Sequence, residues 1–450
     1  MDSVRIGNIS LRKDYAGRVE EENILYYNKV RMDVMLEMNT SLIISTNDEV
    51  RKAFFMNIDE SNDLMKNNKI KKELMLYIHI PFCEKKCDYC DFLSAPASGE
   101  LKERYAAKLV QEIKGHINMK DLYKVSSIFI GGGTPSSLPV KLIRRIMEAV
   151  TETFDTSNNA NDIEITIEVN PGTASSEKLL EYKESGINRL SFGLQSTDNK
   201  ELKELGRIHT YETFLENYSL ARKIGFHNIN IDLMSGLPGQ TIDGWLTTLE
   251  RIIALKPEHI SAYSLIIEEG TPFYSRYGLD YNNEETDRII YTKTKELLQK
   301  NGYNRYEISN YAKGNYECRH NTGYWRRKEY LGLGLGASSL LNGVRMKNEE
   351  EINKYLALDS NLNGLITESS PLSKKEEMEE FMFLGLRLTK GISKTNFLKE
   401  FGQSIEEVYN KELLKSEQEN LLYIGKDNIY LTEKGIDLSN IVMSRFLIED

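Results

Sequence analysis

Cysteine is scarce in this chain, which has only four cysteines in 450 residues. So few cysteines in so long a chain do not form the disulfide framework of a small secreted protein. Three of the four, Cys83, Cys87 and Cys90, fall within eight residues, and the fourth is Cys318. Clustered thiols of this kind indicate a metal or cluster site in a reducing compartment.

An excess of basic charge is also missing, since 58 Lys and Arg stand against 68 Asp and Glu, a net charge of −10. An acidic chain gains nothing from phosphate electrostatics, so we expect no nucleic-acid partner. No apolar run reaches the roughly 18 residues that span a bilayer. The N-terminus lacks the apolar segment of a secretory signal. We therefore expect a cytoplasmic protein with no integral membrane segment.

From residue 74 onward, short apolar runs alternate with helical patterns. Repeated β–α alternation favours a parallel sheet, and six such units predict an α/β fold, a partial (β/α)6 barrel. Ligands of such sheets bind at the C-terminal strand ends, where the cysteines, the GGGTP turn at 131–135 and Gln195 all follow strands. The predicted strands cover residues 74–80, 126–130, 163–169, 189–193, 228–234 and 259–265, and the predicted helices 102–117, 140–153, 176–185, 211–224 and 241–255.

The chain divides into four segments in this interpretation. Residues 1–73 form an N-terminal extension of unknown role with an amphipathic pattern at 21–38 that predicts a helix, and residues 74–300 form the barrel. Residues 301–370 form a connecting region, and residues 371–450 a mainly helical, winged-helix-like module with a hairpin at 421–431. This module holds 11 basic and 15 acidic residues. Because it is acidic, we favour a structural or partner-docking module over a DNA-binding one.

The spacing Cys-x3-Cys-x2-Cys suits an iron–sulfur cluster. Three thiolates can hold three irons of a 4Fe–4S cube, which ordinarily takes four protein ligands, so the fourth iron stays open. S-adenosylmethionine can fill that position through its amino and carboxylate groups, and an electron from the cluster can then cleave its sulfonium. The alternatives are three buried core cysteines or a structural zinc site with His79 as fourth ligand, and we favour the cluster.

The sequence of residues 77–90, YIHIPFCEKKCDYC, resembles the radical S-adenosylmethionine superfamily. It is most similar to the HemN/HemW branch, which holds the oxygen-independent coproporphyrinogen dehydrogenases and the HemW heme chaperones. The similarity extends from about residue 74 to the C-terminus. It implies a cluster on Cys83, Cys87 and Cys90, and it assigns no catalytic residue.

The resemblance also implies contacts to S-adenosylmethionine. Taken alone, the glycine-rich turn could be an ordinary loop. Taken alone, Glu168 could be a solvated carboxylate at the end of a strand. In the family pattern, Tyr77 packs at the S-adenosylmethionine site, Tyr89 shields adenine, Gly132, Gly133 and Thr134 bind the methionine end, and Glu168 contacts the ribose.

A second set of residues matches positions that contact a second S-adenosylmethionine in the dehydrogenases. These residues are Gln195, Arg207 and Asp232. Each alone could be structural, and Arg207 could simply pair with Glu204. Because all three are present together, a second nucleoside-binding pocket is an alternative interpretation.

Two features separate the branches of the family. The dehydrogenases resemble Cys-x3-Cys-x2-Cys-x-Cys, whereas the position of the fourth cysteine is Phe92 here. Residues 320–325, HNTGYW, resemble the His-Asn-x-x-Tyr-Trp motif of HemW proteins. The resemblance implies that His320 contacts heme, because a neutral imidazole is a natural axial ligand of heme iron, although a lone histidine beside aromatics is often structural. We interpret Cys318 as a free buried thiol rather than a second heme contact.

The combined hypothesis is a heme chaperone that binds heme and transfers it to apo-hemoproteins, carrying a 4Fe–4S cluster and S-adenosylmethionine. Its partners would be heme, acceptor hemoproteins and, if radical chemistry occurs, a low-potential electron donor. Two alternatives are enzymes. One is an oxygen-independent coproporphyrinogen III dehydrogenase, and the other is a radical enzyme that acts on intact heme.

Overall fold

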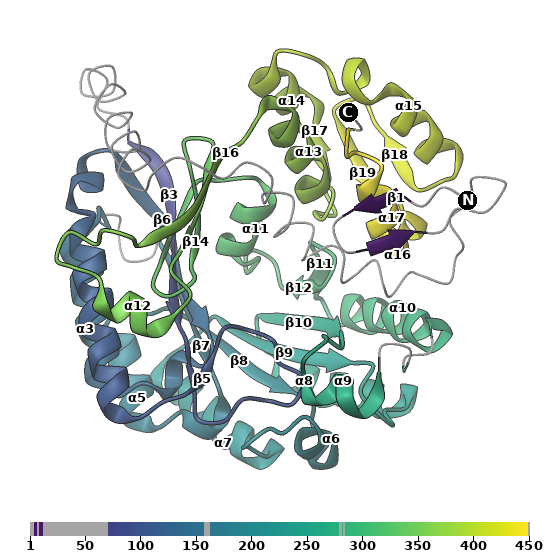
Figure 1. The fold of residues 1–450 in the computed structure, drawn as a ribbon. Coiled ribbons are helices and arrows are strands. Elements are labelled where there is room, and N and C mark those ends of the chain that lie inside the picture. The colour runs from purple at the N-terminus through teal and green to yellow at the C-terminus, as the bar shows by residue number, and fades with distance from the viewer. Residues whose placement is uncertain are drawn as a thin grey trace.

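The computed structural model describes residues 4–6, 9–11, 71–156, 163–278, 281 and 284–448. Its central feature is a sheet of twelve strands in the order β11-β12-β10-β9-β8-β7-β6-β3-β13-β14-β15-β16, which curves around the middle of the molecule (Figure 1). The helix predicted at 21–38 lies outside the described residues. None of the helices in the described ranges is long and apolar enough to cross a bilayer.

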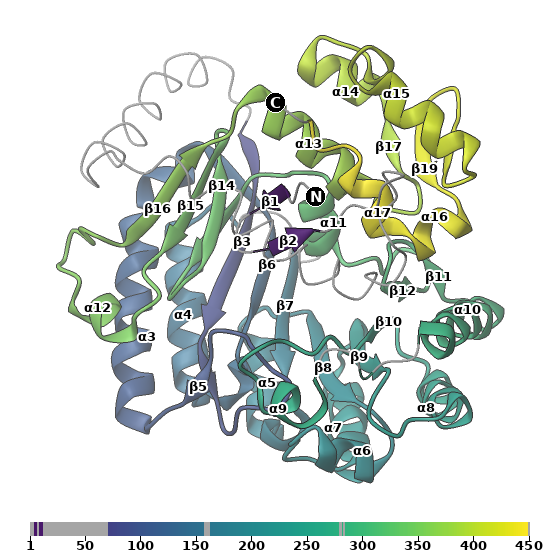
Figure 2. The ribbon, with the colours of Figure 1, turned by 45° about the vertical axis from the view of Figure 1, so that its right-hand side comes forward.

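The six strands that the sequence predicts form the parallel centre of this sheet, and each pairs in parallel with its neighbour. Helices lie on the outer face of the curved sheet (Figure 2), which confirms the partial-barrel prediction. The strands are β3 (Lys72–Ile80), β6 (Tyr123–Gly132), β7 (Glu164–Val169), β8 (Arg189–Gln195), β9 (Ile229–Ser235) and β10 (His259–Ser264), and the helices are α3 (Gly99–Gly115), α4 (Val140–Thr153), α5 (Ser176–Glu184), α7 (Tyr211–Ile224) and α8 (Ile242–Leu255).

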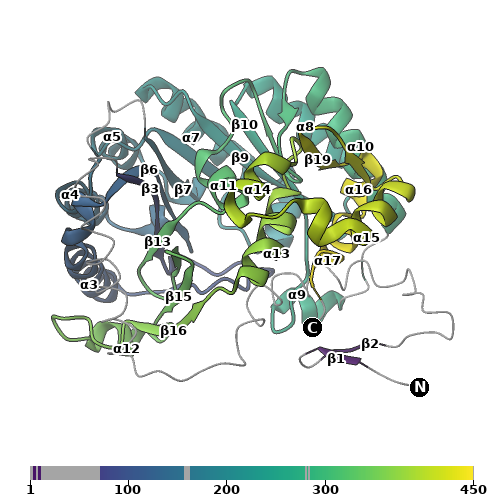
Figure 3. The same cartoon turned by 90° about the horizontal axis from the view of Figure 1, so that it is seen from above.

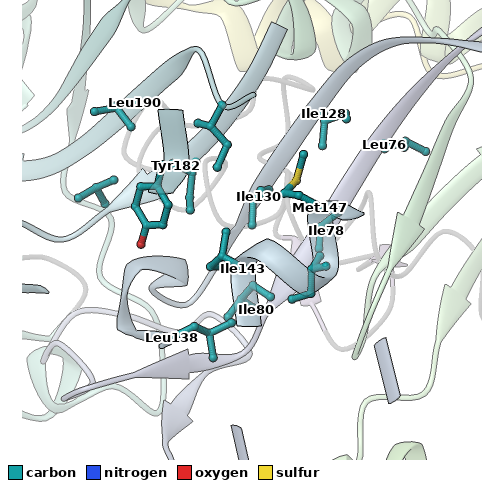
Figure 4. Packing of buried hydrophobic residues seen from close by; sticks show 14 of the residues in the cluster. Leu76, Ile78, Ile80, Ile128, Ile130, Leu138, Ile143, Met147, Tyr182 and Leu190 are labelled. Atoms are coloured by element: carbon teal, nitrogen blue, oxygen red, sulfur yellow. The ribbon is translucent and has the colours of Figure 1, made fainter. Parts of the chain in front are cut away.

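The packing of α4 shows why these segments adopt these structures. Its apolar residues recur at helical spacing, so Ile143 and Met147 both face the sheet and are at most 2% exposed. They lie against Ile78 and Ile130 from the parallel strands (Figure 4). Helix α3 begins three residues earlier than predicted, because the Ser98 hydroxyl accepts the backbone N–H of Leu101 and caps the helix.

The strands at both edges of the sheet are not predicted by the sequence. These strands are two to six residues long and interrupted by glycines and turns, so their alternation is too short to read. β13 (Tyr330–Leu333) runs parallel beside β3. The others are antiparallel: β14 (Ser338–Leu341), β15 (Val344–Asn348) and β16 (Ile366–Pro371) at one edge, and β11 (Asn304–Arg305) and β12 (Asn310–Ala312) at the other.

The C-terminal part has its own apolar core and is mainly helical, as predicted. Its helices are α13 (Lys374–Gly385), α14 (Lys394–Phe401) and α15 (Ile405–Gln418), and β17 (Ile392–Ser393) joins the hairpin of β18 (Leu422–Ile424) and β19 (Asn428–Leu431). The apolar pattern at 374–389 predicts a helix there, and α13 ends at Gly385, four residues short of that limit. A Cβ on Gly385 would lie only 2.2 Å from Ile392.

One short helix, α11 (Arg319–Trp325), lies at the end of the barrel where the parallel strands begin. It contacts both β6 and α13, so it sits between the barrel and the C-terminal module. A view from above shows α11 across this end, with the C-terminal helices beside it (Figure 3). The barrel therefore has a covered end at the strand starts, and its other end is formed by the C-terminal strand ends.

Candidate cofactor site

A cavity of about 360 Å³ opens at the C-terminal ends of the parallel strands. It lies where a parallel α/β sheet is expected to bind its ligand. Most residues that the sequence singled out line this one cavity, whereas Tyr77 and His320 do not. The residues that line it are Cys83, Cys87, Tyr89, Cys90, Gly132, Gly133, Thr134, Glu168, Gln195, Arg207 and Asp232.

The cysteines lie on a loop that begins where β3 ends. The loop is closed by a hydrogen bond from the N–H of Ala95 to the carbonyl of Pro81 at 3.0 Å, and the His79 ring lies 3.1 Å from the carbonyl of Leu93. None of the cysteines forms a disulfide. The loop therefore holds three free thiols around one end of the cavity.

Two side chains donate hydrogen bonds to cysteine sulfurs. The Thr134 hydroxyl lies 3.3 Å from Sγ of Cys83, and a guanidinium nitrogen of Arg207 lies 3.4 Å from Sγ of Cys87. The Arg207 guanidinium also donates to the carbonyl of Gly193. Such donors stabilise negatively charged sulfur, the form of cysteine that binds iron. The alternative pairing of Arg207 with Glu204 is not seen, because Glu204 pairs with Arg276 at 3.2 Å.

The glycine-rich turn after β6 passes too close to its neighbours for any side chain. Gly132 has φ +108°, and a Cβ there would lie 2.5 Å from the His79 ring. A Cβ on Gly133 would lie 2.8 Å from the carbonyl oxygen of Phe82. The backbone N–H of Gly132 donates to Glu168 at 3.2 Å. The N–H groups of Gly133 and Thr134 donate to the carbonyls of Ile80 and Phe82 at 2.9 and 2.7 Å, so the turn can offer a ligand its carbonyl oxygens but not these donors.

Two carboxyl groups, those of Glu168 and Asp232, line the cavity. Burial, with a smaller contribution from Asp232, raises the pKa of Glu168 to about 8. Burial also raises the pKa of Asp232, against hydrogen bonds that include those from Ser191 at 3.1 Å and Asn230 at 2.7 Å. Glu168 is therefore largely protonated at neutral pH, and its hydroxyl can donate to a ligand oxygen.

The remaining predicted contacts differ in how they are held. Gln195 has a positive φ of 76°, and its amide oxygen accepts the Tyr263 hydroxyl at 2.9 Å. Tyr89 packs edge-on against Phe273 with ring centroids 6.3 Å apart. Tyr77 lies behind the cavity wall, where its hydroxyl is 3.0 Å from Nδ1 of His79. Phe92 lines the cavity rim with 58% of its surface exposed.

His320 lies at the opposite, covered end of the barrel, and is 1% exposed. Its Nδ1 lies 2.9 Å from the Ser127 hydroxyl, its Nε2 lies 3.1 Å from the Tyr324 hydroxyl, and its ring stacks on Phe129. Burial, together with the nearby Arg189, lowers the pKa of His320 to about 3, so the ring is neutral. Both ring nitrogens are thus occupied by protein partners in this structure.

Sequence reasoning missed Glu164, which organises this covered end. Its carboxylate accepts from the Cys318 thiol at 3.4 Å and from the backbone N–H groups of Arg319 and His320 at 3.1 and 3.2 Å. Cys318 is fully buried, which raises its pKa to about 12 and agrees with an unreactive thiol. An acidic residue within an apolar strand was the one available signal in the sequence.

Comparison with known proteins assigns this architecture to a family. The model of the radical SAM superfamily matches residues 77–252, and the HemN C-terminal domain matches residues 372–438. Coproporphyrinogen III oxidase (HemN) of Escherichia coli has a similar structure, with a TM-score of 0.74, 24% identity and coverage of 86% of this chain and 93% of that chain. At this identity the likeness shows the fold.

Sequence relatives narrow the assignment. The heme chaperone HemW of Lactococcus lactis is 36% identical over 85% of this chain and 99% of its own length. The heme chaperones HemW of Bacillus subtilis and Escherichia coli are 36% and 33% identical over 83% and 84% of this chain, and 99% and 98% of their own lengths. The superfamily implies a 4Fe–4S cluster and S-adenosylmethionine as cofactors. The chain belongs to the HemW family of radical S-adenosylmethionine proteins.

Proposed function

We propose that this protein is a heme chaperone, which binds heme and transfers it to apo-hemoproteins. The observation that carries the proposal is the 36% identity to a relative named as a heme chaperone, across 99% of that relative's length. A match across the whole relative includes both the cofactor end of the barrel and the C-terminal module.

We further propose that Cys83, Cys87 and Cys90 hold a 4Fe–4S cluster. The chemistry of this donor set fits the group, since the three thiols are free, line one cavity and include two that receive hydrogen bonds at sulfur. Within the described residues, no three His, Cys, Asp or Glu side chains are grouped closely enough for a single metal ion. A cluster of four irons spreads its ligands further apart, so the cysteines suit it better than the zinc alternative.

S-adenosylmethionine would bind in the same cavity. The backbone of Gly132, Gly133 and Thr134 would take its amino-acid end, and the protonated Glu168 would donate to its ribose. Tyr89, which lines the cavity, is the proposed aromatic contact, whereas the contact of Tyr77, which does not line it, stays a prediction. When bound, the cluster can supply an electron that cleaves the sulfonium. Gln195, Arg207 and Asp232 remain candidates for a second nucleoside, and Arg207 already has partners in Cys87 and Gly193.

The heme contact at His320 stays a prediction. For His320 to bind iron, a ring nitrogen must give up its hydrogen bond to Ser127 or Tyr324. The neutral state of the ring suits a metal ligand. The electron donor, the acceptor proteins and the cytoplasmic location also stay predictions.

Two enzyme functions compete with the chaperone. Phe92 at the position of the dehydrogenases' fourth cysteine is a departure from their pattern, and this favours the chaperone over coproporphyrinogen decarboxylation. A radical reaction on intact heme would use the same cluster. The three functions therefore differ in what happens to the tetrapyrrole rather than in the cofactor site.

The test is an anaerobic assay on the full chain with reconstituted cluster. We expect stoichiometric heme uptake, transfer of heme to an apo-hemoprotein, and no consumption of coproporphyrinogen with S-adenosylmethionine and a reductant. Conversion of coproporphyrinogen would identify a dehydrogenase instead. Loss of the visible heme absorption during S-adenosylmethionine turnover would identify a heme-modifying enzyme.

A further inference from the structure

A groove of about 570 Å³ runs between α11 and the C-terminal module, at the covered end of the barrel. Its walls come from the end of α11, from α13 and α14, and from the chain around β17. These elements lie side by side in both views of the ribbon (Figures 1 and 3). The volume lies within the usual range of about 300–1,000 Å³ for small-molecule sites.

The groove has an apolar lining. Trp325 contributes from α11, Phe381 from α13, and Leu388 and Ile392 from the segment that follows it. Trp325 and Phe381 are half-buried, so part of each ring remains open to solvent. Flat aromatic and aliphatic side chains of this kind pack well against a planar apolar molecule.

The groove is also lined by more cationic than anionic side chains, in a chain that is acidic overall. Four cationic side chains line it against one carboxylate, Glu400, although the whole chain has a net charge of −10. Two of the four are already paired, Arg327 with Glu377, Glu380 and Glu400, and Lys390 with Glu317 at 3.5 Å. Arg326 and Lys399 are exposed, and neither pairs with a carboxylate of the described part of the chain.

Trp325 also carries a polar group without a hydrogen-bond partner. Its indole N–H is buried and has no acceptor among the described residues. The guanidinium of Arg387 lies 4.1 Å from the centre of its ring and pairs with Glu307 at 3.5 Å, so its charge is already compensated. An occupant with an apolar body and anionic ends would therefore find a surface for its body and donors for its ends.

We infer that this groove is the heme site, an inference that rests on the proposed function. The macrocycle lies against Trp325 and Phe381, and its two carboxylates pair with Arg326 and Lys399. His320 supports this site from behind, since its hydrogen bond to Ser127 at 2.9 Å joins α11 to β6. The competing occupant is an acidic segment of an acceptor protein, which would use the same cations.

The side chains of the groove also determine whether the protein can coordinate the heme iron. Among the described residues that line it there is no His, Cys, Met or Tyr, the usual axial ligands of heme iron. Heme is held through its face and carboxylates, and its iron stays available to a ligand of the acceptor. Such a site suits transfer, and it takes metal-free protoporphyrin IX nearly as well as hemin.

The experiment is a hemin titration followed by visible absorption on the cluster-loaded full chain. One variant combines Arg326→Glu with Lys399→Glu, and its matched control combines Lys411→Glu with Lys415→Glu, two exposed lysines on α15 of the same module. We expect the groove variant to bind hemin at least about tenfold more weakly and the control within about twofold of the parent chain. Thermal melting checks that both variants fold.

A second probe tests the carboxylates directly. Hemin dimethyl ester lacks both charges, so it should bind the parent chain and the groove variant with equal affinity. Equal hemin affinity of parent, groove variant and control would overturn the inference while leaving the proposed function intact. Loss of transfer to the acceptor without loss of hemin affinity would also overturn it, in favour of an acceptor-docking groove. Failure of the parent chain to bind hemin would instead overturn the proposed function.

Discussion

Glu164 and Glu168 lie on the same strand, β7, four residues apart, yet the two ends of the barrel use them differently. At the covered end, the Glu164 carboxylate accepts three hydrogen bonds from the chain around Cys318. At the open end, Glu168 accepts one hydrogen bond, from the N–H of Gly132, and burial raises the pKa of Glu168 to about 8. Side chains four apart on a strand share a face, so burial inside the barrel alone does not explain the contrast.

The contrast teaches how one barrel separates structural from ligand-binding polar groups. At the covered end, backbone N–H groups of α11 donate to Glu164, so its carboxylate is occupied by structural hydrogen bonds. At the open end, loops with glycines leave room, and the polar groups of Glu168 and Arg207 face a cavity. The polar residues that line the cavity of this barrel therefore lie at the end that no described helix closes.

The largest expected effect separates the cysteines of the two ends. Cys83→Ala removes one of three proposed iron ligands, so reconstituted protein should lose essentially all of its cluster absorption and bound iron. Cys318→Ala, the matched control at the covered end, should keep both. It should also lose about 1–2 kcal/mol of unfolding free energy, because a buried thiol that donates to Glu164 is removed. Full iron content in Cys83→Ala would contradict the proposed ligand set.

A smaller effect tests Glu164 against Glu168. Glu164→Ala leaves the thiol of Cys318 and two backbone N–H groups without an acceptor, so we expect a loss of about 3 kcal/mol of unfolding free energy. Glu168→Ala removes a carboxyl group that accepts one hydrogen bond, so it should lower the unfolding free energy by less than about 1 kcal/mol. Urea unfolding of both variants measures the difference. Equal losses would mean that Glu164 is no more structural than Glu168.

The sequence predicts the open end better than the covered end, for a physical reason. Parallel strands buried on both faces appear as apolar runs, so all six were found within a few residues of their observed limits. The cysteine motif and the glycine turn follow directly after two of these strands. The position of the cofactor cavity can therefore be predicted from local sequence patterns.

The covered end depends on contacts between distant segments. Glu164 and His320 are 156 residues apart, and Ser127 and His320 are 193 apart. No local pattern shows that a seven-residue helix will close over β6 and β7. The sequence therefore shows His320 beside aromatic residues but not its burial, and it gives no sign of the groove beside Trp325.

The last prediction uses pH, because the two ends should respond with opposite sign. The pKa of His320 is lowered to about 3 from an ordinary value of 6.5. Between these two pH values the imidazole is protonated in the unfolded chain but not in the folded chain. Its contribution to stability is present above pH 6.5 and is lost as the pH falls. The pKa of Glu168 is raised to about 8 from an ordinary 4.5, so its contribution is present below pH 4.5 and is lost as the pH rises through 8.

Each group should change the unfolding free energy by about 1 kcal/mol, since relaxation on ionisation reduces the full linkage effect for both groups and water in the open cavity reduces it further for Glu168. We expect His320→Gln to flatten the loss of stability between pH 6.5 and 5, and Glu168→Gln to flatten the loss between pH 6 and 8.5. Urea midpoints of cluster-free protein across this range measure both slopes, and each variant is the control for the other. If His320→Gln leaves the acid slope unchanged, the imidazole already titrates freely in the folded chain, and the hydrogen bonds to Ser127 and Tyr324 do not keep it from a ligand such as heme iron.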